Sequence, residues 1–146
     1  MATSVPRRTV AVALLHVLIA FDAVALLFAG IVHLVGAQIP LGVAVFDEPP
    51  IIPAGVMEGL AGLLFTFATY VVFARRTRAW SVALAAHLFA GAGFLLGIWA
   101  TRLDTTPFNH IYHFVMLGVF VLGLVLLLTP GTRAVLRSGK GDSHGG

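Results

Sequence analysis

The sequence predicts an all-α protein of one domain: an integral membrane four-helix bundle whose N- and C-termini are cytoplasmic. Hydrophobic residues make up 59% of the 146 residues. Charged residues make up only 10%, whereas a typical soluble domain carries roughly 25%. The apolar residues also gather into four long runs, each close to the ~20 residues that a membrane-spanning helix needs. We therefore expect the chain to fold in a lipid bilayer.

The four predicted spans follow one another with short connections. They cover about residues 10–35, 54–73, 80–100 and 110–129. Pro53 suits the first turn of the second helix, and Pro130 with Gly131 is expected to end the fourth. The bundle then accounts for residues 1–137, and the Gly- and Ser-rich tail 138–146 is expected to be disordered.

Basic residues predict how these helices are oriented. Eight of the nine Lys and Arg flank one side of the predicted bundle, namely Arg7, Arg8, Arg75, Arg76, Arg78, Arg133, Arg137 and Lys140. The loops of the opposite side carry Arg102 with Asp47, Glu48 and Asp104. Because cytoplasmic loops are enriched in Lys and Arg, we expect the basic side in the cytoplasm, of a bacterial inner (plasma) membrane. This placement accounts for the net charge of +3 without nucleic acid as a partner.

Small residues predict how the helices pack. In lipid, helices associate through close approach at small side chains. The second helix carries a stripe of Gly55, Gly59 and Gly62. The third carries Ala79, Ala83, Ala86, Ala90, Gly93 and Gly97 on one face. We expect these two helices to pack tightly as a hairpin.

Ionisable and amide side chains inside the predicted spans are the candidate site residues. A charged group near the bilayer centre costs at least ~2.5–3.5 kcal/mol, so each needs a partner or a purpose. The outer third of the bundle is expected to hold His33, Glu58, Asn109, His110 and His113, with Asp22 and His87 deeper. We expect one polar pocket that opens outward, with Glu58 paired to His33 or His113 and the Pro-rich loop at its mouth.

Several chemistries are open to such a pocket. A metal such as Zn, Cu or Fe would find ligands in His33, His110, His113 and Glu58, and two histidines would ligate a haem. A Glu/His pair could instead move protons or hold a quinone, or the side chains could simply bond one another. The absence of cysteine excludes thiolate metal sites and Fe–S clusters. No serine or cysteine nucleophile arrangement is evident, but an enzymatic role that uses the His/Glu cluster stays open. No inverted repeat is evident, and this argues against a transporter.

Three short motifs around the second predicted helix carry a family resemblance. They are Gly-Val-Met-Glu-Gly-Leu-Ala-Gly-Leu-Leu at 55–64, the basic turn at 75–78, and Phe-Ala-Gly-Ile-Val-His-Leu at 28–34. Together they resemble the DoxX-like superfamily of small four-helix membrane proteins, with His33 where a lysine is usual. The resemblance implies that Glu58 and His33 occupy that family's polar site.

The resemblance also implies a function and partners. It suggests a membrane subunit or partner of a quinone-linked redox system. The apolar spans themselves imply contact with the lipid bilayer, and a second copy of the chain stays open as an alternative partner to a redox protein. The alternative is a haem- or metal-binding membrane protein, or an enzyme acting on a lipid-soluble substrate, that uses the His/Glu cluster.

Overall fold

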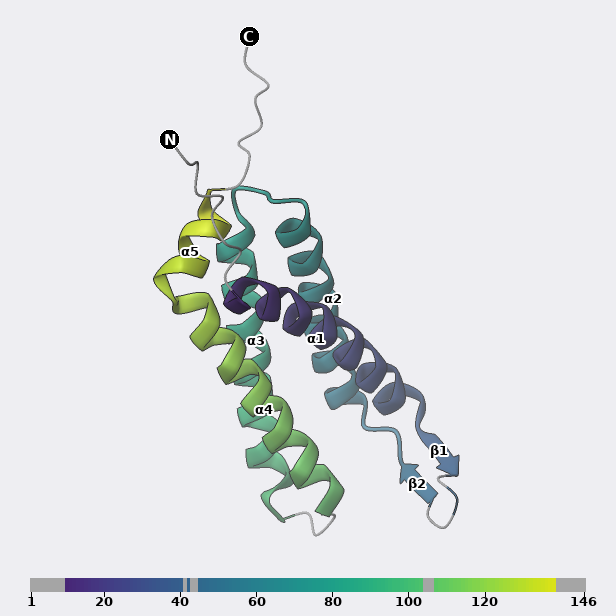
Figure 1. Cartoon of the computed structure of the whole chain (residues 1–146). Helices are drawn as coiled ribbons and strands as arrows, with labels where there is room; N and C mark the ends of the chain where they lie inside the picture. Colours follow the sequence, from purple (N-terminus) through teal and green to yellow (C-terminus); the bar gives the residue numbers. More distant parts are fainter. Residues whose placement is uncertain (1–9, 41, 43–44, 104–106, 139–146) are drawn as a thin grey trace, which may run out of the picture.

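The computed structural model describes residues 10–40, 42, 45–103 and 107–138 of the chain. Four long helices form a bundle (Figure 1): α1 Val10–Val35, α2 Ile52–Phe73, α3 Ala79–Ala100 and α4 Pro107–Leu128. Each contains a segment long and apolar enough to cross a membrane. The predicted all-α four-helix bundle is confirmed, and its apolar helices indicate a multi-pass membrane protein.

A short fifth helix, α5 Pro130–Arg137, follows α4 directly. Pro130 ends α4 as expected, because proline cannot donate the backbone hydrogen bond that a helix interior requires. The sequence analysis did not predict this further helix, which begins at Pro130 because proline also suits the first turn of a new helix. Thr129, the residue before α5, has the extended φ of −62° and ψ of 137° of an N-cap position.

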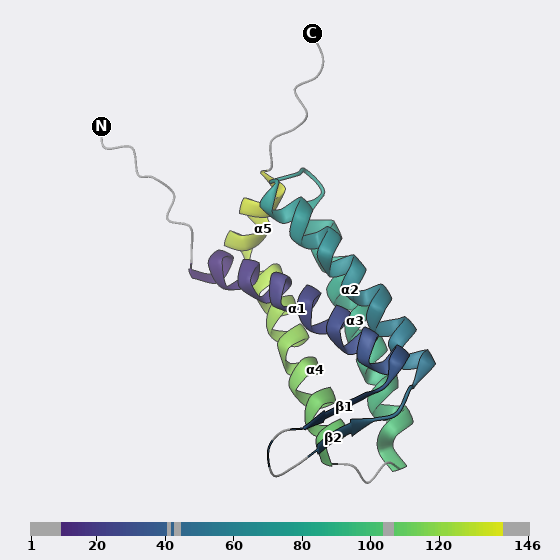
Figure 2. The ribbon, with the colours of Figure 1, turned by 90° about the vertical axis from the view of Figure 1, so that its right-hand side faces the viewer.

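The connection between α1 and α2 contains an antiparallel hairpin that the sequence analysis treated as a loop. Strand β1 Ala37–Pro40 pairs with β2 Val45–Glu48, with Ala37 opposite Glu48. Pro40 is the last residue of β1, and Pro49 and Pro50 directly follow β2. Edge strands tolerate proline at such positions. Gly36 joins α1 to β1 with a φ of +74°, a conformation that side-chain-bearing residues rarely adopt. The hairpin lies at the opposite end of the bundle from α5 (Figure 2).

Helices α1 and α2 approach most closely, along what we call the glycine seam: Gly30, Gly55, Gly59 and Gly62. A Cβ added at Gly30 would lie 2.7 Å from the backbone nitrogen of Gly59. A Cβ at Gly55 or Gly62 would lie within 2.9 Å of the α1 backbone, at Leu34 or Leu27. Helices α2 and α3 pack against each other as expected, but Gly55 and Gly62 of α2 face α1 and not α3.

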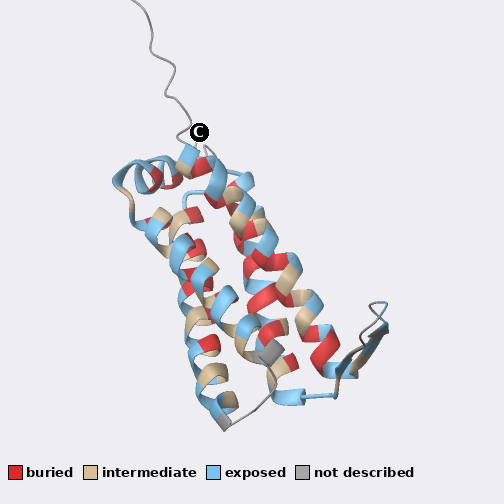
Figure 3. Cartoon of the chain, turned by 60° about the horizontal axis from the view of Figure 1, so that its bottom comes forward, coloured by how far each residue is buried: buried red, intermediate tan, exposed pale blue. Residues whose placement is uncertain are grey.

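The alanine face of α3 points into the bundle as expected. Its buried members are Ala79, Ala83, Ala86 and Ala90. They pack with large buried side chains, including Phe65 of α2 and Phe120 of α4, whose rings stack with centroids 5.8 Å apart. In Figure 3 buried positions recur along the long helices between exposed ones. The exposed positions are mostly large apolar residues, as suits a lipid-facing surface.

Candidate functional site

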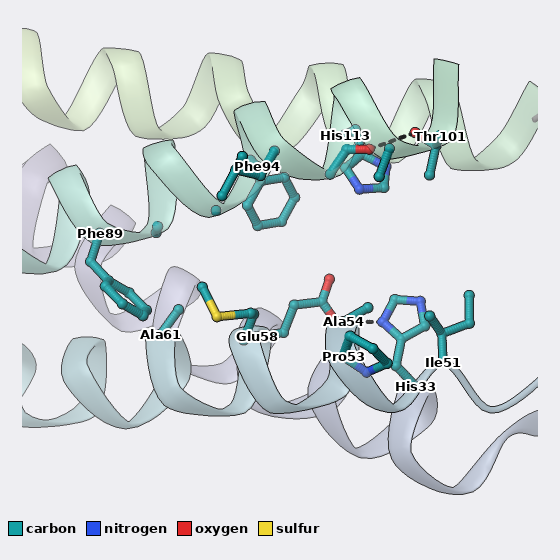
Figure 4. A pocket seen from close by; sticks show the side chains of 16 residues that line it. His33, Ile51, Pro53, Ala54, Glu58, Ala61, Phe89, Phe94, Thr101 and His113 are labelled. Atoms are coloured by element: carbon teal, nitrogen blue, oxygen red, sulfur yellow. Dashed lines mark hydrogen bonds and ion pairs between the residues drawn. The ribbon is translucent and has the colours of Figure 1, made fainter. Parts of the chain in front are cut away.

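A cavity of about 450 Å³ lies between α2 and α3, near the end of the bundle that carries the hairpin. Apolar side chains form most of its walls, among them Met57, Ala61, Phe89 and Phe94. Polar groups enter it from His33, Glu58, Thr101 and His113. Figure 4 shows His33 and Glu58 on one wall, with Phe94 and His113 facing them from the other. We call this space the α2–α3 cavity.

His33 and Glu58 form the polar wall of the α2–α3 cavity. Nδ1 of His33 lies 2.5 Å from Oε2 of Glu58, and each residue is only 7% exposed. The glycine seam brings their two helices together, and the backbone N–H of Ile51 donates to the His33 carbonyl oxygen at 2.7 Å. The predicted pairing of Glu58 with a histidine is confirmed, and His33 is the partner.

Two further residues extend this pair into a chain of polar contacts. Nε2 of His33 lies 3.5 Å from Oε1 of Glu48 in the hairpin. On the other side, the Tyr112 hydroxyl of α4 donates to Oε1 of Glu58 at 3.0 Å. Each nitrogen of His33 thus faces a carboxylate, and each oxygen of Glu58 has a partner. An imidazole between two carboxylates can accept a proton on one nitrogen and release one from the other.

His113 of α4 lines the opposite wall. Its ring centroid lies 5.5 Å from that of Phe94 and 5.5 Å from that of Tyr112. The missing side chain of Gly97 leaves room for it, since a Cβ there would lie 2.6 Å from Nε2 of His113. The Thr101 hydroxyl donates to the Gly97 carbonyl oxygen at 2.8 Å. Both His113 and Glu58 therefore face the cavity, from different helices.

Asp22 and His87 lie elsewhere, in the closed core of the bundle. Both are fully buried, and neither lines the α2–α3 cavity. Asp22 is eleven residues from His33 along α1, about 16 Å at the helical rise, so sharing a helix face does not bring it to the same site. The single pocket that the sequence analysis expected therefore does not include these two residues.

The surroundings of His87 and Asp22 differ. Nδ1 of His87 lies 2.7 Å from the Ala83 carbonyl oxygen, and its ring packs edge-on against Phe65 with centroids 4.8 Å apart. Within the described part of the chain, Nε2 of His87 and both carboxyl oxygens of Asp22 have no hydrogen-bond partner. Such buried groups are uncommon in proteins, and we assign them no role in the cavity.

The remaining candidates lie at the start of α4. His110 is half-buried and does not line the cavity. The side chain of Asn109 and the whole of Asp104 lie outside the residues that the structure describes, as do residues 139–146 of the tail.

The described histidines and carboxylates do not gather into a metal site. Over residues 10–40, 42, 45–103 and 107–138, no three His, Asp or Glu side chains come together in a group that could hold a metal ion. His33 shows why, because its two nitrogens face two different carboxylates, Glu58 and Glu48. A metal site needs donors that converge on one point.

Several site residues were not singled out from the sequence. Tyr112, which donates to Glu58, is not among the candidate residues that the sequence indicates. Its polar hydroxyl within an apolar run was the available signal. Phe89, Phe94 and Met57 gave no signal at all, because apolar and aromatic residues are ordinary in membrane helices.

No protein-family model, curated protein or solved structure matches this chain. The resemblance to the DoxX-like superfamily therefore rests on the three sequence motifs alone. What the site does has to be argued from its own geometry.

Proposed function

We propose that this protein binds a quinone in the α2–α3 cavity and serves as a membrane subunit or partner of a quinone-linked redox system. The observation that carries the proposal is an apolar cavity with a buried His33–Glu58 pair in its wall. The resemblance to the DoxX-like superfamily points the same way.

The size and lining of the cavity suit a lipid-soluble ring. Its volume of about 450 Å³ falls in the range of roughly 300–1,000 Å³ typical of small-molecule sites. Phe89 and Phe94 offer flat apolar surface, and polar groups stand on both walls, with His33 and Glu58 across from His113. A quinone head is a flat ring with an oxygen at each end, so it would use polar partners on opposite walls.

The chain of polar contacts supports a role in proton transfer. A quinone that accepts electrons must also take up protons, and a quinol that is oxidised must release them. Glu58 and His33 stand at the cavity, and Glu48 links them to the hairpin at the end of the bundle. In this proposal the electrons pass to or from a redox protein in the same membrane.

We further propose that the cavity lies toward the non-cytoplasmic side of a plasma membrane. The hairpin end holds Asp47 and Glu48, whereas the α5 end holds five of the described arginines. Because the chain has no cysteine, single-cysteine variants report topology directly. A membrane-impermeant maleimide added to intact cells should label Gln38→Cys and spare Ser138→Cys. The reverse labelling would contradict this orientation.

Binding of decylubiquinone to the purified protein tests the proposal. We expect about one quinone per chain, with carbonyl stretching bands shifted from those of quinone in detergent. Glu58→Gln should weaken binding roughly 10–100-fold, because the hydrogen bond to a charged group that orients His33 in the cavity wall is lost. Asp47→Asn is the matched control, because Asp47 is an exposed carboxylate near the same end that accepts a hydrogen bond from Gln38 and does not line the cavity.

Two results would contradict the proposal. One is wild-type protein that stays folded yet takes up no more decylubiquinone than empty detergent micelles. The other is equal affinity in wild type and Glu58→Gln, which would place any bound quinone away from the His33–Glu58 pair. A redox protein that copurifies with wild type from native membranes would support the proposed role as a subunit or partner of a redox system. Purification as a lone monomer would count against that role.

A further inference from the structure

Two arginines lie over one tryptophan at the end of the bundle opposite the hairpin. The guanidinium carbons of Arg133 and Arg137 lie 4.9 Å and 4.2 Å from the ring centroid of Trp80. The indole N–H of Trp80 donates to the Leu127 carbonyl oxygen at 3.0 Å. The ring is therefore held in place by α4 while two positive charges gather over it. We call Trp80, Arg133 and Arg137 the arginine–tryptophan cluster.

The helix that presents these arginines is docked on the bundle. Thr132 and Leu136 of α5 are buried, whereas Arg133 and Arg137 are exposed. The Thr129 hydroxyl, just before α5, donates to the Leu126 carbonyl oxygen at 2.8 Å and lies 2.9 Å from the Thr132 hydroxyl. Residues four apart share one helix face, so the two guanidinium groups are displayed side by side on an anchored element.

No carboxylate balances this charge within the described residues. The acidic residues described are Asp22, buried in the middle of α1, and Asp47, Glu48 and Glu58, all toward the hairpin end. The neighbouring α2–α3 turn adds the exposed Arg75 and Arg78. Like charges brought this close repel one another, so an anionic partner at this end would be stabilising.

We propose that the arginine–tryptophan cluster is a binding site for the phosphate of an anionic phospholipid. Guanidinium groups bind phosphate oxygens in pairs of parallel hydrogen bonds, and tryptophan favours the level of the lipid headgroups. Basic pockets at the ends of membrane helices recognise such headgroups. The site is independent of the quinone proposal, because it uses no residue of the α2–α3 cavity and lies at the other end of the bundle.

Fluorescence quenching by brominated lipid tests the site directly. The chain has two tryptophans, so Trp99→Phe leaves Trp80 as the only indole. Vesicles of one fixed mixture of phosphatidylglycerol and phosphatidylcholine are prepared with bromine on either the first lipid or the second. We expect brominated phosphatidylglycerol to quench Trp80 several-fold more per labelled lipid, because the two guanidinium groups would hold its phosphate beside the indole by paired hydrogen bonds.

Variants distinguish a specific phosphate-binding site from the general attraction of anionic lipid to positive charge. Arg133→Gln with Arg137→Gln should abolish the excess quenching. Arg133→Lys with Arg137→Lys keeps the charge but loses the planar fork, and most of the excess should disappear. Trp80→Phe leaves Trp99, which lies at the other end of the bundle with Arg102 over its ring at 4.7 Å, and it should show no excess.

Three outcomes would overturn the proposal. Equal quenching of Trp80 by the two brominated lipids would show that no anionic lipid is held there. If the double lysine variant kept the full excess quenching, positive charge alone would explain the effect. Loss of the excess in inorganic phosphate, but not in chloride of the same ionic strength, would make soluble phosphate the ligand in place of lipid.

Discussion

Tyr112 of α4 donates a hydrogen bond of 3.0 Å to Oε1 of Glu58 on α2. The other oxygen of Glu58 faces His33 of α1. One carboxyl group thus connects three of the four long helices at the edge of the α2–α3 cavity. Because both of its oxygens are engaged, Glu58 is held in a single orientation before any ligand arrives.

Removing the Tyr112 hydroxyl should loosen this arrangement. We expect Tyr112→Phe to lower the free energy of unfolding by about 1–3 kcal/mol, since a part-buried hydrogen bond to a carboxylate is lost. The ring contact with Phe94, at 5.6 Å between centroids, should remain. Unfolding in mixed SDS micelles measures the change. Tyr70→Phe is the control, because the Tyr70 hydroxyl is exposed and accepts a hydrogen bond from Arg76 at 3.2 Å. Equal effects of the two variants would contradict this account of Glu58.

A methyl group in the glycine seam should push α1 and α2 apart. In Gly30→Ala the new Cβ would meet the Gly59 backbone at 2.7 Å, and backbone cannot move aside as a side chain can. We expect a loss of about 1–3 kcal/mol in unfolding free energy. Gly59→Ala is the matched control on the facing helix, since its Cβ would meet nothing within 4 Å. That variant should be neutral or gain up to ~1 kcal/mol from helix propensity. A Gly30→Ala protein as stable as wild type would show that the seam is looser than described.

Filling the α2–α3 cavity should block the proposed ligand while leaving His33 and Glu58 in place. Gly93 lines the cavity, and a Cβ there would come no closer than 3.8 Å to Met57. Gly93→Leu should therefore fold and lose most decylubiquinone binding. Gly91→Leu, also on α3 and with nothing within 4 Å of its Cβ, should bind as wild type does. Undiminished binding in Gly93→Leu would place the quinone elsewhere.

Because His87 packs against Gly123, the effects of substitutions at the two positions on the unfolding free energy should depend on each other. A Cβ at Gly123 would collide with Nε2 of His87, so Gly123→Ala alone should destabilise the bundle. In a His87→Ala background the ring is gone, and the same substitution should be tolerated. The double-mutant cycle should give a coupling of at least ~0.5 kcal/mol in unfolding free energy. Additive effects would mean that the ring moves aside freely.

The apolar runs predicted the helices well because each span must satisfy its own backbone in lipid. The span over 10–35 coincides with α1, and the other three differ by three residues or fewer at each end. The hairpin was missed because its strands have four residues each, and prolines beside them are equally typical of loops. Pro130 was read only as a stop signal, although the same residue type also starts helices.

Which helices pack against each other was harder to predict than where each helix begins and ends. A stripe of glycines shows which face of α2 packs closely, but it does not say which neighbour lies against that face. The same limit explains the site: periodicity put Asp22 on the face of His33 but could not show that only His33 reaches the cavity. The His33–Glu58 pair could be predicted because two ionisable groups at similar depth each need a partner.

The glycine seam also determines which parts of the bundle can move when the cavity fills. The space between α1 and α2 at Gly30 and Gly59 does not admit even a Cβ atom, so we expect these two helices to move together as one unit. The cavity lies on the other side of α2, against α3. A bulky occupant would therefore be accommodated by a tilt of α3 and α4, and spin labels should report a wider α2–α3 distance at constant α1–α2 distance.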